Sequence, residues 1–503
     1  MNSFIKSPQI FQKTPWLERI ILPLIMPLFL LGLVFLFFPS RERFLFDIDE
    51  GTQLMWANLA NNGYSLYDQI WIDHPPLFTN ILQIGFNLLG FKVGVGRYLV
   101  LLFSCVTIWG IFQYLLIVFG KKHAISGTIL ILLLPHYLRL SVSIMQAIPN
   151  ICLAILSLLT LIKWHKTQRF FWLIISAIFL SLSIFIKLFT LFFAPIFIIG
   201  IFVDCYTQTK KQKLRLRAFF PVFLWTIVLA TILIIAGYVF IGIDNLDKVL
   251  GIHLMATSSA NRQFINFKLF EHLRNSTPFL ILGILGAIII LQERRWLALY
   301  PLAWMLSTFI FLNFLSPVYY HYIILITIPA AILGTIPFYK TIVHGIEFFK
   351  ALQKNSLTKS TIQILSVIGI VLLFIKVPEG FSVLEWPPSL TGSGLGLRTN
   401  ELRFLNLISN YAPETNWIVT DRPMFAARAR LLVPPELAAV GEKRIKTGLL
   451  SEDDIINIIE QYNPEQIFLG RYSLKIVETH IAGNYHVIHS FNSMKLYLRN
   501  DLK

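Results

Sequence analysis

Long apolar runs separated by short polar stretches dominate the first three quarters of the chain. A run of about 20 apolar residues is needed to cross a hydrocarbon core of roughly 30 Å. Where a stretch is so long that one helix would overshoot the bilayer, as in 123–162 and 170–203, we divide it into two helices. The pattern then predicts about eleven membrane-spanning helices, at residues 20–38, 98–118, 123–137, 142–162, 170–186, 188–203, 218–241, 277–292, 296–315, 321–339 and 360–377.

Two polar interruptions are too long to be simple connections between these helices. The first covers residues 40–96 and the second covers residues 242–276. Within the first, Gly51–Gly63 and Pro75–Leu89 have apolar residues at helical spacing, which is typical of amphipathic helices that lie in the membrane surface. We therefore expect residues 1–377 to form a transmembrane domain whose two large loops face the same side.

The last part of the chain, residues 378–503, changes to a mixed polar and apolar pattern after a segment rich in proline, glycine and serine. Ser451, followed three residues later by Asp454, is typical of a helix start. Helix-like and strand-like segments alternate, which predicts a small soluble α/β domain. The expected helices are Glu401–Tyr411 and Ser451–Tyr462, and the expected strands are Trp417–Thr420, Gln466–Leu469, His486–Ser490 and Lys495–Leu498.

Composition agrees with a polytopic membrane protein. Of the 503 residues, 55% are hydrophobic and only 14% are charged, and the mean hydropathy is +0.66, values that exclude an ordinary soluble globule. The net charge of +16 does not indicate nucleic-acid binding, because the basic residues form short clusters between apolar runs. The three cysteines form no close pair, so neither a disulfide framework nor a cysteine metal site is expected.

The basic clusters also predict the orientation in the membrane. Lys and Arg are retained on the cytoplasmic side, and alternate connections carry them, at Lys121-Lys122, 163–169, 210–217, Arg294-Arg295 and 340–359. The first apolar run lacks a cleavage pattern and reads as a retained anchor, so the N-terminus is expected in the cytoplasm. An odd number of spans then puts the C-terminal domain outside, in the periplasm or a lumen.

Candidate chemistry lies just after the first apolar run, where Asp47, Asp49 and Glu50 form an acidic string. Ionisable groups close to a bilayer are functional candidates by default. The alternative is structural, because an acid before a helix starting near Gly51 would satisfy free backbone N–H groups. A third reading is that Asp47 and Asp49 hold a divalent cation through their carboxylates.

Further short motifs follow this string in a recognisable order. They are Asp49-Glu50-Gly51, Trp56-Ala57, Asn62-Gly63, Tyr67-Asp68, His74-Pro75-Pro76-Leu77, Arg97, Lys187, Tyr319-Tyr320-His321-Tyr322 and Pro329, then Val419-Thr420-Asp421-Arg422-Pro423 and Pro434-Pro435-Glu436-Leu437 in the C-terminal part. This series resembles the GT-C membrane glycosyltransferases of the protein O-mannosyltransferase and lipid A aminoarabinose transferase type.

The resemblance implies transfer of a sugar from a polyprenyl-phosphate carrier to a lipid, glycan or protein acceptor at the outer face of the membrane, with inversion at the anomeric carbon. It also implies a bacterial inner-membrane protein that needs no cofactor. Asp49 matches the family's general base, a role for which a positioned carboxylate is suited, and Glu50 is its catalytic neighbour. Fixed cations would stabilise the phosphate leaving group, for which the candidates are Arg97, Lys187, Arg262 and His321.

Substrate-binding candidates are Asp47, His74, Asn150, Tyr319 and Tyr320. Several of these residues have simpler readings as well. Arg97 and Lys187 can extend from helix ends to lipid headgroups, Arg262 can be a solvated loop residue, the tyrosines can form an interfacial aromatic belt, and His74 can shape a turn.

One departure from the family bears on activity. Family members often carry a second acidic residue near the start of the fourth span, where this chain has Gln146 and Asn150. An amide neither accepts a proton nor carries charge, so sugar binding or metal dependence is expected to differ. The competing functions are a secondary transporter, which should show repeats and paired broken helices, and a non-catalytic scaffold that kept the GT-C fold.

Overall fold

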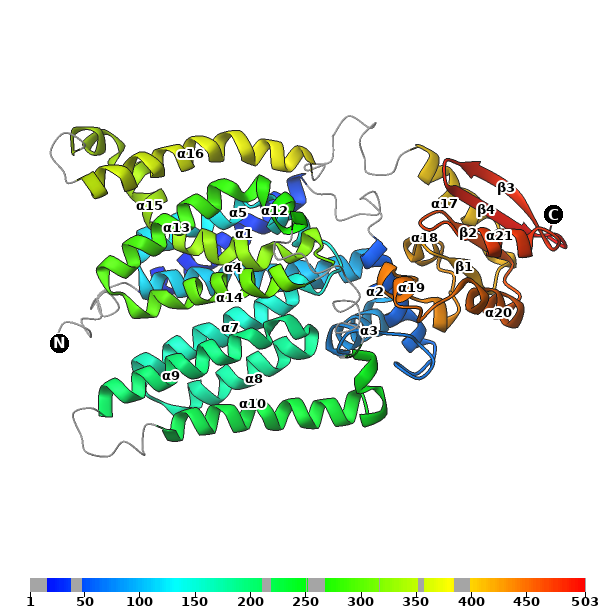
Figure 1. Ribbon diagram of the computed structural model, residues 1–503, viewed down its shortest axis with the longest axis horizontal. Helices are drawn as coiled ribbons and strands as arrows, with labels where there is room; N and C mark the ends of the chain where they lie inside the picture. The colour runs from blue at the N-terminus through cyan, green and yellow to red at the C-terminus, as the bar shows by residue number, and fades with distance from the viewer. Residues whose placement is uncertain are drawn as a thin grey trace.

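Apolar helices lie side by side in a bundle that forms the larger part of the molecule (Figure 1). The computed structural model describes residues 16–37, 48–209, 219–249, 251, 267–315, 317–351, 357–383 and 399–502. The helices of the bundle are α1 (Trp16–Phe37), α4 (Val93–Val118), α5 (Lys121–Leu132), α7 (Ala147–Thr167), α8 (Phe170–Ile186), α9 (Phe193–Thr209), α10 (Phe219–Phe240), α13 (Thr277–Glu293), α14 (Leu299–Phe314), α15 (Ile324–Ala351) and α16 (Leu357–Val383).

Eight helical segments within the described residues are long and apolar enough to cross a membrane. They are Val93–Val118, Ala147–Thr167, Leu188–Thr207, Phe219–Phe240, Phe267–Glu293, Trp296–Phe314, Tyr320–Val343 and Thr361–Glu379. Shorter apolar helices occur at Ile21–Leu36 and Phe170–Ile186, where further spans were predicted. The predicted span at 123–137 coincides with α5, which is only 12 residues long. The protein is an integral membrane protein, but the predicted count of eleven spans is not confirmed.

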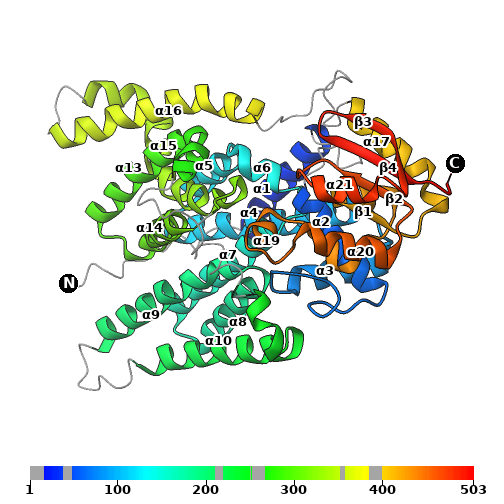
Figure 2. The ribbon, with the colours of Figure 1, turned by 45° about the vertical axis from the view of Figure 1, so that its right-hand side comes forward.

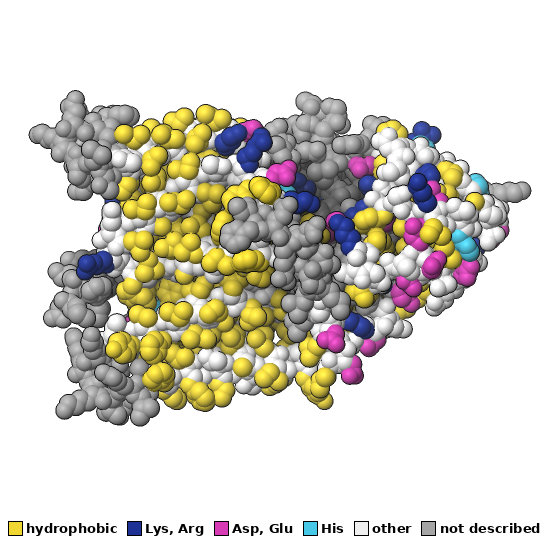
Figure 3. Space-filling model, in the orientation of Figure 1, with side chains coloured by type: hydrophobic (Ala, Val, Ile, Leu, Met, Phe, Trp, Pro, Cys, Tyr) yellow, Lys and Arg dark blue, Asp and Glu magenta, His cyan; other side chains and the backbone are white. Residues whose placement is uncertain are grey.

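Helix α15 is the centre of the bundle, and α10 is at its edge. In the apolar segment of α15, 94% of residues are buried, whereas in α10 only 17% are. Close packing at the centre depends on α13, because a Cβ at Gly286 would overlap the carbonyl oxygen of Leu333 in α15. Hydrophobic side chains cover the visible outer face of the bundle (Figure 3), as expected for a surface that contacts lipid.

Between the bundle and the C-terminal part lie two helices from the first long loop, α2 (Ile48–Asn61) and α3 (Leu77–Leu89) (Figure 1). These two helices agree with those predicted at Gly51–Gly63 and Pro75–Leu89, so both predictions are confirmed. Helix α3 buries Phe78 and Leu82 and leaves Leu88 on its surface 76% exposed. An exposed apolar face beside a buried one fits a helix that lies along the membrane surface.

Short helical elements connect the longer ones. Two of them, α6 and η7, contribute side chains to the site described below. They are α6 (Pro135–Leu140), η2 (Leu188–Phe192), η4 (Ile243–Asn245), α12 (Phe267–Leu273), η5 (Arg274–Ser276), η6 (Trp296–Ala298) and η7 (Tyr320–Tyr322).

The C-terminal part contains a four-stranded sheet in the order β1-β2-β4-β3, in which β1 and β2 are parallel and the other neighbours antiparallel. The four predicted strands and two predicted helices are confirmed, and Ser451 with Asp454 forms a capping box. The elements are α17 (Thr399–Asn410), η8 (Ala412–Glu414), β1 (Ile418–Thr420), α18 (Pro423–Ala429), η9 (Pro435–Leu437), α19 (Glu442–Lys446), α20 (Glu452–Tyr462), β2 (Gln466–Leu469), α21 (Lys475–Ile481), β3 (Tyr485–Phe491) and β4 (Met494–Arg499).

Successive side chains of a strand point to opposite faces of its sheet, and all four residues of β2 are buried, so this strand is covered on both faces. Ile467 and Leu469 join one apolar cluster that includes Ile455 of α20 and Val477 of α21. Phe468, between them, packs with the ring of Phe404 on α17, 5.0 Å away, and with that of Phe425 on α18, 4.7 Å away. Helices therefore cover the sheet on each side (Figure 2).

The C-terminal part packs directly on α2. A Cβ added to Gly51 would overlap the backbone nitrogen of Met424 in α18, so the two helices approach with no room for a side chain. Helix α16 continues to Val383, beyond the predicted division at residue 378, and the next described residue is Thr399. The boundary of the soluble domain itself stays a prediction.

Candidate functional site

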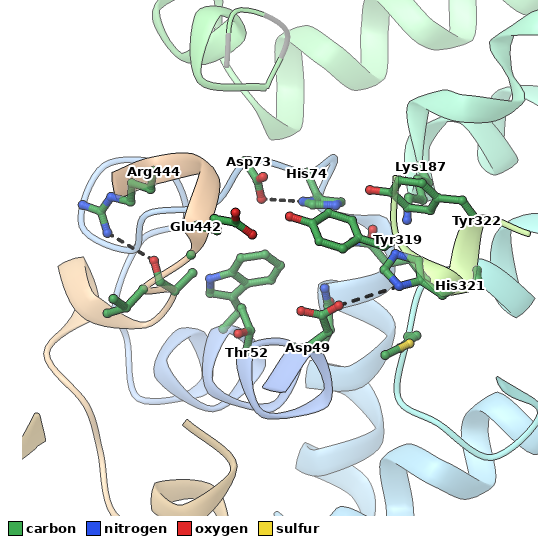
Figure 4. Close-up of a pocket in the computed structure, with 18 of the residues that line it drawn as sticks. Asp49, Thr52, Asp73, His74, Lys187, Tyr319, His321, Tyr322, Glu442 and Arg444 are labelled. Atoms are coloured by element: carbon green, nitrogen blue, oxygen red, sulfur yellow. Dashed lines mark hydrogen bonds and ion pairs between the residues drawn. The ribbon is translucent and has the colours of Figure 1, made fainter. Parts of the chain in front are cut away.

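A cavity of about 400 Å³ opens where one end of the bundle meets the C-terminal part. It combines many charged and aromatic side chains from segments that lie far apart in the sequence (Figure 4). Its lining comprises Asp49, Thr52, Gln53, Trp56, Trp71, Asp73, His74, Arg139, Met145, Gln146, Ala147, Lys187, Tyr319–Tyr322, Ala439–Glu442, Arg444 and Arg471.

Asp49 belongs to the first turn of α2, where acidic side chains are favoured by the helix dipole. Its side chain is 51% exposed, and its Oδ2 lies 3.8 Å from Nδ1 of His321. In Figure 4, Asp49 lies between Glu442 on one side and His321 on the other. An exposed carboxylate in this position can accept a proton from a molecule bound in the cavity.

Glu50 points away from the cavity and into the bundle. Its carboxylate accepts two hydrogen bonds from Arg97, from Nε at 3.1 Å and from Nη2 at 2.7 Å, and both side chains are fully buried. Its Oε1 also accepts the backbone N–H of Ile144 at 2.8 Å. Glu50 therefore connects α2 to α4 and to the chain before α7, and neither it nor Arg97 is brought to the cavity with Asp49.

Asp73 and His74 form a pair at the cavity wall, with Oδ1 of Asp73 2.5 Å from Nδ1 of His74. The carbonyl oxygen of His74 accepts a hydrogen bond from the hydroxyl of Tyr67 at 2.8 Å. Tyr67 has a left-handed backbone, with φ of 71°, which L-residues other than Asn and Asp seldom adopt. The hydrogen bond from Tyr67 therefore holds the backbone at His74 in place, and with it the Asp73–His74 pair.

Lys187 follows α8 at the point where the helix ends and the backbone becomes extended. Its side chain is almost completely buried, with 7% exposed. The ammonium lies 4.7 Å from the ring centre of Tyr322 and 5.0 Å from that of Phe189, distances at which a cation is attracted to an aromatic face. Asn150 does not line the cavity but donates to the carbonyl oxygen of Lys187 at 3.1 Å, so it holds this corner of the chain.

The aromatic string before α15 forms another part of the wall. The rings of Tyr319 and His321 stack at 5.7 Å with an angle of 11°, and Arg139 lies 4.9 Å from the ring centre of Tyr320. Burial, together with the negative charges of Glu442 and Asp49, raises the pKa of Tyr319. Its hydroxyl therefore stays protonated at neutral pH and can donate a hydrogen bond.

The C-terminal part supplies the remaining wall through the segment 439–444 and through Arg471. These residues were not predicted from the sequence as parts of the site, and neither were Asp73 and Arg139. Asp73 had a detectable signal, because it directly precedes the motif beginning at His74. The others had none, since only the folded chain brings segments so distant in sequence together.

Two predicted residues, Asp47 and Arg262, lie outside the described residues. One of the two proposed ligands of a divalent cation, Asp47, is thus outside the described residues, whereas the other, Asp49, is within them. Among the described residues, no group of three or more His, Cys, Asp and Glu side chains has the arrangement of a metal site. The ionisable side chain placed beside Asp49 is that of His321, whose Nδ1 lies 3.8 Å from the Asp49 carboxylate.

Residues 73–238 match the sequence model of the dolichyl-phosphate-mannose-protein mannosyltransferase family. No curated protein sequence matches the chain. Two structures of ArnT from Cupriavidus metallidurans, one bound to undecaprenyl phosphate and one in the apo state, are each 14% identical to this chain and have a TM-score of 0.59. Each comparison covers 96% of this chain and 98% of ArnT.

The oligosaccharyltransferase of Archaeoglobus fulgidus, in complex with zinc and sulfate, is 12% identical over 89% of this chain and 67% of its own, with a TM-score of 0.49. The ArnT similarity extends over almost the entire chain, including the C-terminal part. The protein therefore has the GT-C fold of the membrane glycosyltransferases of ArnT and protein O-mannosyltransferase type, as its motifs indicated.

Proposed function

We propose that the protein transfers a sugar from a polyprenyl-phosphate donor to an acceptor at the extracytoplasmic face of the membrane. The observation that carries the proposal is the position of Asp49, exposed in a cavity between a cationic, aromatic end and the wall from the C-terminal part. The undecaprenyl phosphate bound to ArnT supports a lipid phosphate as the carrier.

Asp49 acts as the general base in this proposal. The acceptor hydroxyl or amine attacks the anomeric carbon from the side opposite the phosphate, so the configuration at that carbon inverts. As the new bond to the anomeric carbon forms, Asp49 takes the acceptor proton, and the bond between that carbon and the phosphate oxygen breaks. A carboxylate positioned beside the acceptor contributes typically 10²- to 10⁴-fold to the rate of such a step.

Lys187, His321 and Arg139 are proposed to bind the lipid phosphate, whose negative charge increases as it leaves. Cations fixed in a site with little water stabilise such a charge more than they would in bulk solvent. Lys187 is suited to this role because it lines the cavity and is almost completely buried at the end of α8. Burial of an aliphatic stem and an ammonium against aromatic rings restricts the position of the charge.

His74, Asp73, Tyr319 and Tyr320 are proposed to bind the sugar or the acceptor. Asp73 and Tyr319 supply an acceptor and a donor of hydrogen bonds at the cavity wall, which suits the hydroxyl groups of a sugar. Gln146 lines the cavity where the family often has an acidic residue. The carboxylate of Asp73 is a second acidic group in the same cavity, which supports activity despite the amide at position 146.

For Glu50 and Arg97 we propose a positioning role in place of the direct roles expected from the sequence. Their buried pair sets the rotation of α2, and this rotation directs Asp49 toward the cavity. We further propose that the protein lies in a bacterial inner membrane, with the N-terminus in the cytoplasm and the C-terminal domain in the periplasm. The basic connections between the apolar runs support this orientation.

The test is to incubate the purified protein with radiolabelled polyprenyl-phosphate sugars and a total envelope extract, and to identify the labelled fraction. Asp49→Asn should abolish labelling without changing expression or membrane insertion. Asp68→Asn is the matched control, because Asp68 is an exposed acid of the same loop that does not line the cavity. Transfer by Asp49→Asn at the parent rate would show that Asp49 is not the base.

A further inference from the structure

Two C-terminal motifs found in the sequence, Val419–Pro423 and Pro434–Leu437, have no part in the chemistry proposed above. The first includes the end of β1 and the start of α18, and the second includes η9. Both lie beside segments that line the cavity. Their contacts explain how the C-terminal part forms its wall.

Asp421, in the first motif, holds the loop that follows β2. Its buried carboxylate, in a residue only 1% exposed, accepts three backbone N–H groups. These come from Gly470 at 3.1 Å, Arg471 at 2.7 Å and Tyr472 at 3.0 Å. Three donors on one carboxylate fix the loop firmly, because backbone N–H groups left buried without a partner are costly.

Arg471 is the residue that this loop presents to the cavity. Among the described residues, no carboxylate lies within 4 Å of its guanidinium, which is instead 5.0 Å from the ring centre of Tyr472. The charges of Arg471, Glu442 and Asp49 all act on the hydroxyl of Tyr319. The guanidinium is therefore a cation near the proposed base, and its charge acts on Glu442 only at a distance and not through an ion pair.

The second motif holds another arginine. Nη1 of Arg444 donates to the carbonyl oxygens of Glu436 at 2.5 Å and Ala439 at 3.4 Å. The guanidinium also lies 4.6 Å from the ring centre of Trp71 in the first loop. Arg444 thus ties the segment 436–442 to the loop that carries the proposed catalytic residues.

Glu442, in the same wall, has its own cation. Its carboxylate accepts a hydrogen bond from the ammonium of Lys446 at 2.5 Å, and this hydrogen bond lowers the pKa of Glu442. Because Lys446 largely neutralises Glu442 and Arg444 is engaged by carbonyl oxygens, Arg471 is the group of this wall best able to bind an anion. The wall faces the end of the cavity opposite Lys187 (Figure 4).

We propose that the C-terminal segment forms the acceptor side of the cavity, where Arg471 binds an anionic group of the acceptor and Asp421 positions Arg471. This inference rests on the proposed sugar transfer. The donor phosphate is assigned to Lys187, within the bundle, where a lipid carrier can reach it from the membrane. The acceptor then enters beside the C-terminal wall, with Asp49 between the two.

The experiment measures donor and acceptor use separately in the full-length protein. Binding of a radiolabelled polyprenyl-phosphate sugar gives the donor affinity, and the amount of envelope extract that gives half-maximal labelling reports acceptor use. Arg471→Gln should raise the half-maximal amount of extract about tenfold or more, as expected for loss of a hydrogen bond to a charged group, and should leave donor affinity within about twofold. Arg471→Lys should recover part of the loss because it keeps the charge without the planar fork.

Arg403→Gln is the matched control, because Arg403 is an exposed residue of α17 that does not line the cavity. Equal weakening of donor binding in Arg471→Gln would assign Arg471 to the donor phosphate and overturn the inference. So would a half-maximal amount of extract unchanged from the parent. Failure of the parent to transfer from any donor would instead overturn the proposed function.

The positioning role of Asp421 is tested without any substrate. In Asp421→Ala, amide hydrogen exchange at residues 470–472 should accelerate, because the carboxylate that accepts their N–H groups is gone. In Arg471→Gln the same amides should exchange as in the parent, since the backbone contacts remain. Unchanged exchange in a folded Asp421→Ala variant would exclude the positioning role. If Asp421→Ala does not fold, the acceptor role is still tested, because that test uses only Arg471→Gln.

Discussion

Replacing Glu50 by Gln separates the two roles that its place beside Asp49 suggests. The substitution leaves Arg97 with its full charge in a fully buried position and with only a neutral amide in place of the carboxylate. Breaking a buried ion pair by removing one charge typically destabilises a protein by about 3–5 kcal/mol. The Gln side chain can still accept the N–H of Ile144, so that backbone group adds no further loss.

The double variant Glu50→Gln with Arg97→Met removes the remaining buried charge. Replacing both members of a buried pair is often close to neutral for stability, so the double variant should unfold near the temperature of the parent, whereas the single variant unfolds well below it. In the double variant the Gln side chain can keep the contact with Ile144 and the Met side chain can fill the place of Arg97, so α2 should keep its rotation. If the pair acts only by positioning α2, the double variant should therefore transfer sugar at a rate close to that of the parent. Thermal unfolding in detergent, followed by tryptophan fluorescence, and the radiolabel assay measure the two quantities on the same preparation.

Two results would refute this reasoning. A Glu50→Gln variant as stable as the parent but unable to transfer sugar would assign Glu50 to the chemistry, as the sequence led us to expect. A stable but inactive double variant would lead to the same conclusion, unless Arg97→Met alone is equally inactive. In that case Arg97 would be the group that the reaction needs.

Four further predictions concern other parts of the molecule. Lys187→Met should weaken donor binding at least tenfold and should leave unchanged the amount of envelope extract that gives half-maximal labelling. A variant that binds the donor as tightly as the parent would show that Lys187 does not bind the phosphate. Gly51→Val should lower stability by about 1–3 kcal/mol and reduce transfer, because the side chain overlaps the backbone of Met424; an unaffected variant would show that the helices separate easily. Burial raises the pKa of Asp421 above its ordinary 3.8, so the native state binds this proton more tightly than the unfolded chain. The protonated Asp421 therefore adds its whole contribution to the free energy of unfolding below pH 3.8, and this contribution is lost as the pH rises through the native pKa. When the unfolding temperature is measured against pH, Asp421→Asn should show a smaller decrease than the parent over this range. Chelation with EDTA should leave transfer unchanged, and a loss restored by a divalent cation would point to a metal near Asp49.

Local patterns predicted local structure well. The strand-like segment Gln466–Leu469 was predicted with the same bounds as β2, and Ser451 with Asp454 correctly predicted a helix start. These signals depend on residues within a few positions of one another, so the surrounding fold changes them little. The span count was less accurate, because the run at 123–137 is interrupted near Pro135, where α6 begins, and hydropathy alone does not register that break.

The site was predicted only where its residues share a segment with a motif. Asp49 and His74 were identified in this way, whereas Arg471 and Glu442 come from loops that only the folded C-terminal part brings to the cavity. Arg97 shows the opposite difficulty. Its place at a helix end suggested a side chain that reaches lipid headgroups, but a carboxylate from another helix makes full burial more favourable, and that partner is 47 residues away in the chain.

The three residues Asp49, Glu50 and Gly51 have separate tasks because they are consecutive in a helix. Successive positions in an α-helix are rotated by about 100°, so three neighbours must point in three directions. Asp49 faces the cavity, Glu50 faces the bundle and pairs with Arg97, and Gly51 faces α18 without a side chain. The contacts at positions 50 and 51 hold α2 from both sides and so leave its rotation little freedom. The direction of the Asp49 carboxylate is thus set by its two neighbours, and Glu50→Gln alone or Gly51→Val should disturb the cavity even though, of the three residues, only Asp49 lines it.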